Sequence, residues 1–158
     1  TVTAGKILIA TGGTPNIDEK LDGKEHVITS NEAFDLKELP RRIVVAGGGY
    51  IAVEFANIFL GLGAQVCLVY RGETILNGFD DDVRVHVHTE LKRQGVSVVT
   101  GTVLKEISHA GDGYQVSLAN GMRVESDLVM HAIGRNGGDH DRTIRQGHLP
   151  VWSGGLPR

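Results

Sequence analysis

The chain has 158 residues, of which 41% are hydrophobic, and its net charge at neutral pH is −3. This size and composition suit a globular domain with a proper core, and the charge gives no electrostatic reason to expect a nucleic acid or an anionic membrane as partner. No apolar run approaches the roughly 20 residues of a membrane span, and no signal peptide is visible after Thr1.

The first segments lead into the main part of the chain. Lys6–Ala10 is expected to be a strand, and the Thr-Gly-Gly stretch that follows it is either a plain turn or a point where the backbone can approach a ligand closely. Val27–Ile28 is expected to be a short extended piece, and Ser30 is expected to cap a short helical turn. Pro40 ends any helix before it.

A glycine turn between a buried strand and a helix is the strongest pattern in the chain. Ile43–Ala46 is a continuous apolar run, which is typical of a strand buried on both faces. Gly47, Gly49 and Ala52 then fit the G-x-G-x-x-G/A pattern of dinucleotide-binding turns. The helix expected from Tyr50 would present its free N–H groups and positive dipole end to a pyrophosphate. The candidate contacts are therefore Gly47, Gly49, Tyr50, Ile51 and Ala52.

The residue after the next strand predicts which dinucleotide binds. The helix is expected to run to Leu60, and Gln65–Tyr70 is expected to be the second strand. An NAD site usually places an acid at the end of that strand, but no acid stands there. Arg71 offers instead a planar fork of donors that suits a 2′-phosphate. We therefore expect NADPH, with the alternative that Arg71 is a solvated turn residue.

The second half of the chain predicts one more helix and several strands. Acids at Asp80–Asp82 favour the start of a helix that extends to about Gln94. His86 and His88 lie two residues apart and so on different helix faces; we expect surface histidines and no metal site. The expected strands are 96–99, 103–107, 114–118, 123–124 and 127–133. Cys67, the single cysteine, is expected to be a core residue and not a nucleophile.

These elements together predict an α/β fold of the Rossmann-like, dinucleotide-binding type. Residues 41–133 are expected to form a β-α-β-α-β arrangement, a three-stranded antiparallel insert and a returning strand on a central parallel sheet.

Several stretches resemble the NADPH domain of glutathione reductase-type enzymes, within the flavin-dependent pyridine nucleotide–disulfide oxidoreductases. They are ILIATGGTP (7–15), TSNEAFDL (29–36), GGGYIAVEFANIFLGLG (47–63), YRG (70–72), FDDDVR (79–84) and AIGR (132–135). The resemblance implies three regions: the end of an FAD-domain segment with its crossover in residues 1–26, the NAD(P)-binding domain in 27–133, and the start of the return to the FAD domain in 134–158.

The resemblance also implies roles for individual residues. Thr11 and Gly12 would belong to the crossing near the flavin's pyrophosphate side, and Gly134 to the return. Tyr50 resembles the tyrosine that covers the nicotinamide-facing side of the flavin. Glu54 resembles the glutamate that pairs with a flavin-side lysine, and it lies one turn from Tyr50 on the same helix face. Local chemistry alone favours a solvated carboxylate at Glu54.

The chain departs from the family at two places. The second basic contact to the 2′-phosphate usually falls where this chain has Asn77 and Gly78, so Arg71 would hold the phosphate with fewer partners. Residues 136–158 lack the family's flavin-binding pattern. Our hypothesis for this tail is a truncation or reading-frame artefact that is poorly ordered.

The resemblance implies an enzyme that passes electrons from NADPH to FAD, then to a redox disulfide and finally to oxidised glutathione. It would be a cytoplasmic homodimer. The FAD glycine pattern, the C-x4-C redox pair and the interface domain are not in this sequence, so no residue of the chain is assigned a catalytic role and the chain alone is expected to lack disulfide reductase activity. A relative with a trypanothione, mercuric or lipoamide acceptor, and a non-catalytic dinucleotide-binding module, remain as alternatives.

Overall fold

The computed structural model describes residues 8, 10 and 12–137 of the chain. It divides into two compact units, Pro15–Gly134 and a smaller one formed by Thr1–Thr14 with Arg135–Arg158. Strand β1 (Gly13–Pro15) pairs with β10 (Arg135–Gly137) as a two-stranded sheet. Most of the strand expected at residues 6–10 lies outside the residues that the structure describes. The same holds for nearly all of the tail, residues 136–158, to which the hypothesis of an artefact applies.

The larger unit is built on a parallel sheet of five strands in the order β2-β9-β3-β4-β5. The strands are β2 (Val27–Ile28), β3 (Arg42–Ala46), β4 (Gln65–Tyr70), β5 (Ser97–Thr100) and β9 (Leu128–His131). β3 lies at the centre and its last four residues are buried, as the apolar run predicts. The returning strand β9 inserts between β2 and β3, with Val44 opposite Val129. The predicted α/β fold is confirmed.

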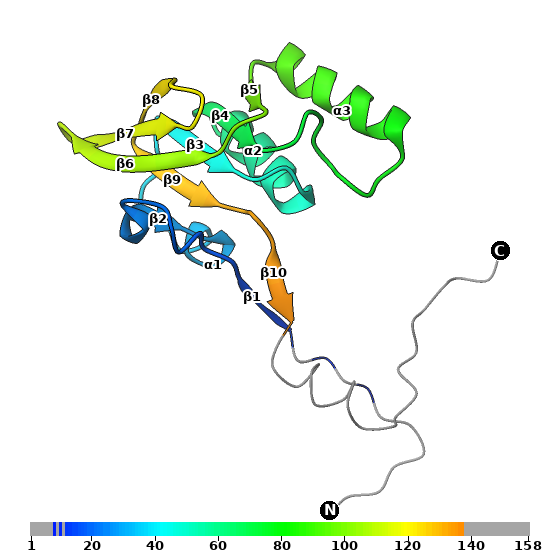
Figure 1. Ribbon diagram of the computed structural model, residues 1–158, viewed down its shortest axis with the longest axis horizontal. Coiled ribbons are helices and arrows are strands. Elements are labelled where there is room, and N and C mark those ends of the chain that lie inside the picture. Colours follow the sequence, from blue (N-terminus) through cyan, green and yellow to red (C-terminus); the bar gives the residue numbers. More distant parts are fainter. Residues whose placement is uncertain (1–7, 9, 11, 138–158) are drawn as a thin grey trace, which may run out of the picture. The chain divides into compact units, whose positions relative to one another are not determined.

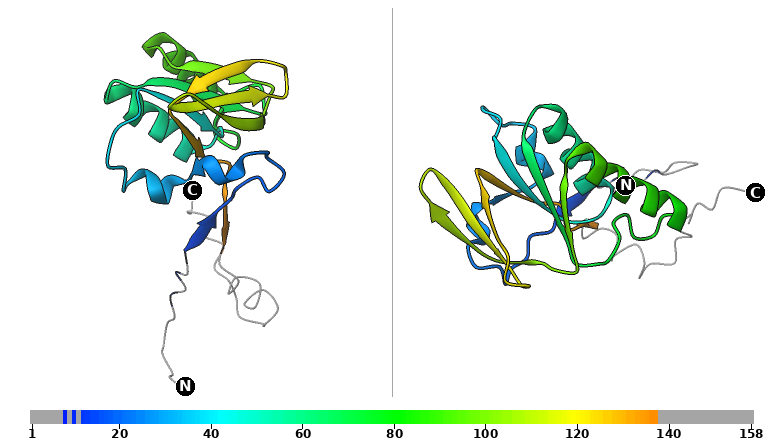
Figure 2. Two further views of the ribbon diagram at one scale, coloured as in Figure 1. Left: turned by 90° about the vertical axis from the view of Figure 1, so that its left-hand side faces the viewer. Right: turned by 90° about the horizontal axis from the view of Figure 1, so that it is seen from above.

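The two faces of this sheet carry different layers, because successive side chains of a strand point to opposite sides. Figures 1 and 2 show helix α2 (Tyr50–Gly61) on one face and an antiparallel sheet on the other. Val45, Leu68 and Met130 pack towards α2, whose buried residues are Ala52, Val53, Phe55, Ala56 and Phe59. The adjacent residues Val44, Val69 and Val129 pack against the antiparallel sheet.

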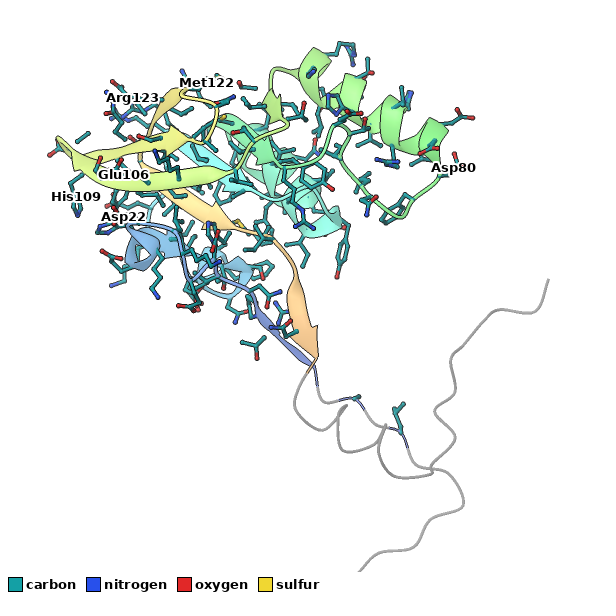
Figure 3. The ribbon with its side chains drawn as sticks, viewed as in Figure 1. Asp22, Asp80, Glu106, His109, Met122 and Arg123 are labelled. Carbon is teal, nitrogen blue, oxygen red and sulfur yellow. The ribbon has the colours of Figure 1, made fainter. Side chains whose placement is uncertain are left out.

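The antiparallel sheet is the predicted three-stranded insert. Its strands are β6 (Leu104–Ala110), β7 (Gly113–Leu118) and β8 (Arg123–Ser126), in sequential order. Asp22 pairs with Glu106 as an isolated bridge, and the Ile107 N–H donates to the Asp22 carbonyl over 2.8 Å. Figure 3 shows Asp22, Glu106 and His109 on one side of the unit, where the loop before η1 (Lys24–His26) meets β6.

Helix ends follow the capping rules, with one difference from the sequence prediction. Helix α1 (Ser30–Ala33) is capped by Thr29, so the assignment of the cap to Ser30 was wrong. Thr29 and Glu32 form a reciprocal capping box, which requires the spacing of three residues that Ser30 does not have to Glu32. Helix α3 (Asp81–Gln94) begins at the predicted acids, with Asp80 as its cap, and Gly95 ends it in the left-handed region at φ 107°.

Candidate dinucleotide-binding site

The turn between β3 and α2 can be formed only by glycine at its first position. Gly47 has φ 141°, and its N–H donates to the Val69 carbonyl over 2.9 Å. A Cβ added at Gly47 would lie 2.2 Å from the Ala132 carbonyl oxygen. Because real Cβ atoms do not approach a backbone oxygen so closely, the turn passes between β4 and β9 with no room for a side chain.

The second glycine faces open space. Gly49 is the N-cap of α2, no side chain caps the helix there, and a Cβ at Gly49 would meet no atom within 4 Å. The first intrahelical bond into this cap runs from the Val53 N–H to the Gly49 carbonyl over 3.2 Å. The N–H groups of Tyr50, Ile51 and Ala52 therefore have no acceptor within the helix. This combination of free donors, dipole and open space fits the pyrophosphate of a dinucleotide.

The third small position supports the turn. Ala52 is fully buried, and its own Cβ lies 3.3 Å from the place that a side chain on Gly47 would take. Ile51 is half-buried and packs against the core on the α2 face of the sheet. The helix thus approaches the strand as closely as the small-residue pattern predicts.

Tyr50 and Glu54 lie together on the open side of α2. Tyr50 is 56% exposed, and Glu54 is exposed as well. Neither side chain has a hydrogen bond or an ion pair with the residues that the structure describes. Both groups are therefore available to a ligand or to another part of a longer protein.

Arg71 stands free at the carboxyl end of β4. It is exposed and forms no ion pair within the described part of the chain, whereas Arg42, Arg84 and Arg93 each bind a carboxylate. Asn77 and Gly78 are exposed on the same loop, and Gly78 cannot supply a side-chain donor. A guanidinium without a partner at this position fits a phosphate on the adenosine ribose.

The loop after Arg71 is fixed by contacts that the sequence did not reveal. The Leu76 N–H donates to the Gly48 carbonyl, which ties the loop to the glycine turn. Arg84 of α3 donates from Nε to the Ile75 carbonyl over 3.1 Å and from its terminal nitrogen to the Thr74 carbonyl over 3.1 Å. The loop is therefore held between the turn and α3.

The candidate residues of the crossover are described only in part. Thr11 lies outside the described residues. Gly12 is exposed with φ 69°. Gly134 has φ 126°, and its carbonyl accepts a 2.9 Å hydrogen bond from the Asn16 N–H. The role of these residues near a flavin stays a prediction.

Two histidines and the single cysteine are buried or half-buried, and burial shifts their pKa values. His131, at the end of β9, is 3% exposed, and burial lowers its pKa, although the charge of Asp18 acts in the opposite direction. His88 is half-buried, and desolvation and Lys92 lower its pKa, so the expectation of two surface histidines on α3 holds only for His86. The Nδ1 atoms of His88 and His131 are buried and find no partner among the residues that the structure describes. Cys67 is buried as predicted, and burial raises the pKa of its thiol.

A cleft of about 430 Å³ lies at the opposite, amino edge of the sheet. Its polar lining comes from Arg42, Gln65 and Ser97, at or beside the first residues of β3, β4 and β5, and from Glu125. Figure 3 shows Met122, which also lines the cleft, far from Asp80, which follows the loop at the carboxyl end of β4. Since ligands of open α/β sheets bind at the carboxyl ends of the strands, this cleft is separate from the candidate dinucleotide site.

Sheet, turn and helix together define the chain as a dinucleotide-binding domain of the α/β class. A family model described as pyridine nucleotide–disulphide oxidoreductase matches residues 1–157. The chain belongs to that family. None of the helices in the described part is both long enough and apolar enough to cross a membrane.

Relatives and solved structures agree with this assignment. Glutathione reductase from a Nostoc species is 42% identical over 135 residues, which cover 84% of this chain and 29% of that protein. Trypanothione reductase from Trypanosoma congolense is 43% identical over 136 residues, which cover 84% of this chain and 27% of that protein. The structure of a copper(II) complex of the flavoprotein disulfide reductase RclA from Escherichia coli matches with a TM-score of 0.74 and 29% identity, covering 81% of this chain and 30% of that one. The chain thus spans less than a third of the length of these relatives.

Proposed function

We propose that this chain is the NADPH-binding part of a flavin disulfide oxidoreductase of the glutathione reductase type. The observation that carries the proposal is the exposed Arg71, without an ion pair in the described part of the chain, beside a glycine turn whose helix presents free N–H groups. A cation at this position favours a 2′-phosphate and leaves no acid to bind a free ribose hydroxyl. The 42% identity to a glutathione reductase supports the type of enzyme.

Each residue of the site has a separate task in this proposal. The N–H groups at the start of α2 bind the pyrophosphate, and the bare Gly49 lets it approach. Arg71 binds the 2′-phosphate. Tyr50 and Glu54 face the nicotinamide and the flavin side. Bound NADPH supplies the hydride, and the protein orients it and excludes water.

Further parts of the intact enzyme complete this function. Thr11, Gly12 and Gly134 would contact FAD, with residues 1–26 and 134–158 belonging to the FAD domain and 27–133 to the NADPH domain. The intact enzyme would be a cytoplasmic homodimer that reduces glutathione disulfide. The chain alone is expected to lack this activity; NADPH-dependent reduction of oxidised glutathione by the purified chain would contradict that expectation.

The test is a calorimetric titration of the chain with NADPH and with NADH. We expect tighter binding of NADPH, and we expect Arg71→Ala to weaken NADPH binding by roughly tenfold or more, since a hydrogen-bonded charge pair contributes about 1.5–3 kcal/mol. NADH binding should hardly change.

Arg123→Ala removes another exposed arginine, on β8, and serves as the matched control. Its affinities should equal those of the parent chain. Equal binding of the two nucleotides would reject the NADPH assignment, and binding of neither would reject the proposed module.

A second candidate has a different electron acceptor. The similarity to a trypanothione reductase, 43% identical, is as high as that to a glutathione reductase. A mercuric or lipoamide acceptor belongs to the same group of alternatives, and a non-catalytic dinucleotide-binding module is a further one. The length of the native transcript separates an intact enzyme from a module, and the turnover of glutathione disulfide against trypanothione disulfide by the intact enzyme separates the acceptors.

A further inference from the structure

The ring of Tyr70 is enclosed by two glycines at the carboxyl end of β4. A Cβ added at Gly48, the middle residue of the glycine turn, would lie 2.4 Å from Cδ2 of Tyr70. A Cβ added at Gly72 would lie 2.7 Å from Cε1 and 3.2 Å from the hydroxyl oxygen of the same ring. One edge of the ring therefore lies against the nucleotide turn, and the hydroxyl end lies against the residue that follows Arg71.

These contacts fix the direction of the side chain. Any side chain at Gly48 or Gly72 would collide with the ring, so both glycines are needed for Tyr70 to take this place. Tyr70 packs against the core on the α2 face of the sheet and remains partly exposed. The ring cannot turn away from the turn without losing this packing.

The Tyr70 hydroxyl has no hydrogen-bond partner among the residues that the structure describes. The residue is half-buried, and its hydroxyl can donate one hydrogen bond. The hydroxyl lies beside Gly72, next in the chain to Arg71, whose guanidinium forms no ion pair within that same described part. Tyr70 and Arg71, two successive residues at the end of β4, thus each carry a donor without a partner in the described part of the chain.

We infer that Tyr70 is a specificity-determining residue whose hydroxyl donates a hydrogen bond to the 2′-phosphate bound by Arg71. This inference rests on the proposed function. Tyr70 would give the phosphate a second donor. The chain has Asn77 and Gly78 on the neighbouring loop and therefore no basic side chain at those two positions. A phosphate dianion accepts several hydrogen bonds at once, so a phenol and a guanidinium from successive residues can both donate to it.

The test compares two probes that differ only in the 2′-phosphate: adenosine 2′,5′-bisphosphate and adenosine 5′-monophosphate. Calorimetry measures their affinities for the parent chain, for Tyr70→Phe and for Tyr114→Phe. The first variant keeps the ring between the glycines and removes only the hydroxyl. The second removes a hydroxyl from β7, outside the site, and serves as the matched control.

We expect Tyr70→Phe to weaken the bisphosphate by roughly tenfold and to leave the monophosphate within twofold, since a hydrogen bond to a charged group accounts for such a factor. Tyr114→Phe should change neither affinity. An equal loss for both probes would mean that Tyr70 only packs the turn and would overturn the inference.

The remaining outcomes separate this inference from the proposed function. If the parent chain prefers the bisphosphate and Tyr70→Phe keeps that preference, the inference fails and the proposed function stands. If the parent chain binds both probes equally, the phosphate site is rejected together with the NADPH assignment. If it binds neither, the dinucleotide-binding module itself is rejected.

Discussion

The two ends of the parallel sheet use the same strands for opposite purposes. At the carboxyl end, Arg71, Tyr50 and the first N–H groups of α2 have no partners in the described part of the chain. At the amino end, Arg42 binds Asp127 through its backbone N–H, over 2.9 Å, and through two side-chain nitrogens, over 3.2 and 2.7 Å. It also binds Glu125 over 2.6 Å. Unpaired groups at one end can bind a ligand, while paired groups at the other hold the sheets together.

A buried serine completes the amino end. Ser126 has no exposed surface, and its Oγ accepts from the Val44 N–H over 3.1 Å and donates to the Leu128 carbonyl over 2.6 Å. The hydroxyl thus joins β8 to β3 where the antiparallel sheet meets the parallel one. The paired groups and the proposed binding groups therefore lie at opposite ends of the strands, so substitutions should change stability and nucleotide affinity separately.

The largest effect is expected where the turn meets the sheet. Gly47→Ala forces a residue with a Cβ into φ 141° and against the Ala132 carbonyl oxygen. We expect a loss of at least about 3 kcal/mol in the free energy of unfolding, measured by urea titration, because strain and overlap add.

Gly49→Ala is the matched control for this prediction. Its φ is −83° and the space around it is open, so folding should change by less than about 1 kcal/mol. NADPH binding should nevertheless weaken, because the methyl group occupies the approach to the pyrophosphate. A destabilisation equal to that of Gly47→Ala would contradict the distinction between the two glycines.

The amino end is tested by Ser126→Ala. This change leaves the buried Val44 N–H without its side-chain acceptor, and we expect the free energy of unfolding to fall by about 1–3 kcal/mol. Ser108→Ala, at an exposed position of β6, should stay within about 0.5 kcal/mol. If Ser126→Ala changed NADPH affinity as well, stability at the amino end of the sheet and binding at the carboxyl end would not be independent.

Acid should destabilise the domain through histidines whose pKa is lowered in the folded state. Burial lowers the pKa of His131 in the folded state, so the unfolded chain takes up the proton first as the pH falls through the ordinary value of 6.5. The stabilisation is complete above that value and is lost below it. Between pH 7.5 and 5.5 we expect a loss of about 1 kcal/mol from this residue, by urea titration at both pH values.

Two features isolate the histidine effect. Arg42 lowers the pKa of Asp127 and Thr29 that of Glu32, so the stability from these carboxylates is lost only below their ordinary values of 3.8 and 4.5. His131→Leu should reduce the pH dependence above pH 5.5, while the share of His88, whose pKa is lowered too, should remain. An unchanged pH dependence in His131→Leu would refute the assignment.

The smallest effect is expected at Glu54. Its carboxylate is exposed and has no partner within the described residues, so Glu54→Gln should change the free energy of unfolding by less than about 0.5 kcal/mol. NADPH affinity of the chain alone should also stay within twofold, by calorimetry. A larger change would place Glu54 in direct contact with the nucleotide and not with a flavin-side lysine.

Local sequence patterns determined much of this domain. The apolar run at β3, the small residues at Gly47, Gly49 and Ala52, and the acids at the start of α3 each act on their own neighbours, so spacing alone predicts them. The side on which α2 packs follows from its helical period, and the buried residues Phe55 and Phe59 agree with it. The cap of α1 was misplaced by one residue because two adjacent hydroxyl side chains competed for it.

Only the tertiary structure decided which distant residues meet. The insertion of β9 between β2 and β3 buries His131 and brings Asp127 to Arg42. The ring of Tyr70 lies against Gly48 because of the register between β3 and β4, which places the end of β4 beside the glycine turn. Strand order and register arise from packing over the whole sheet, and no local pattern in the chain encodes them.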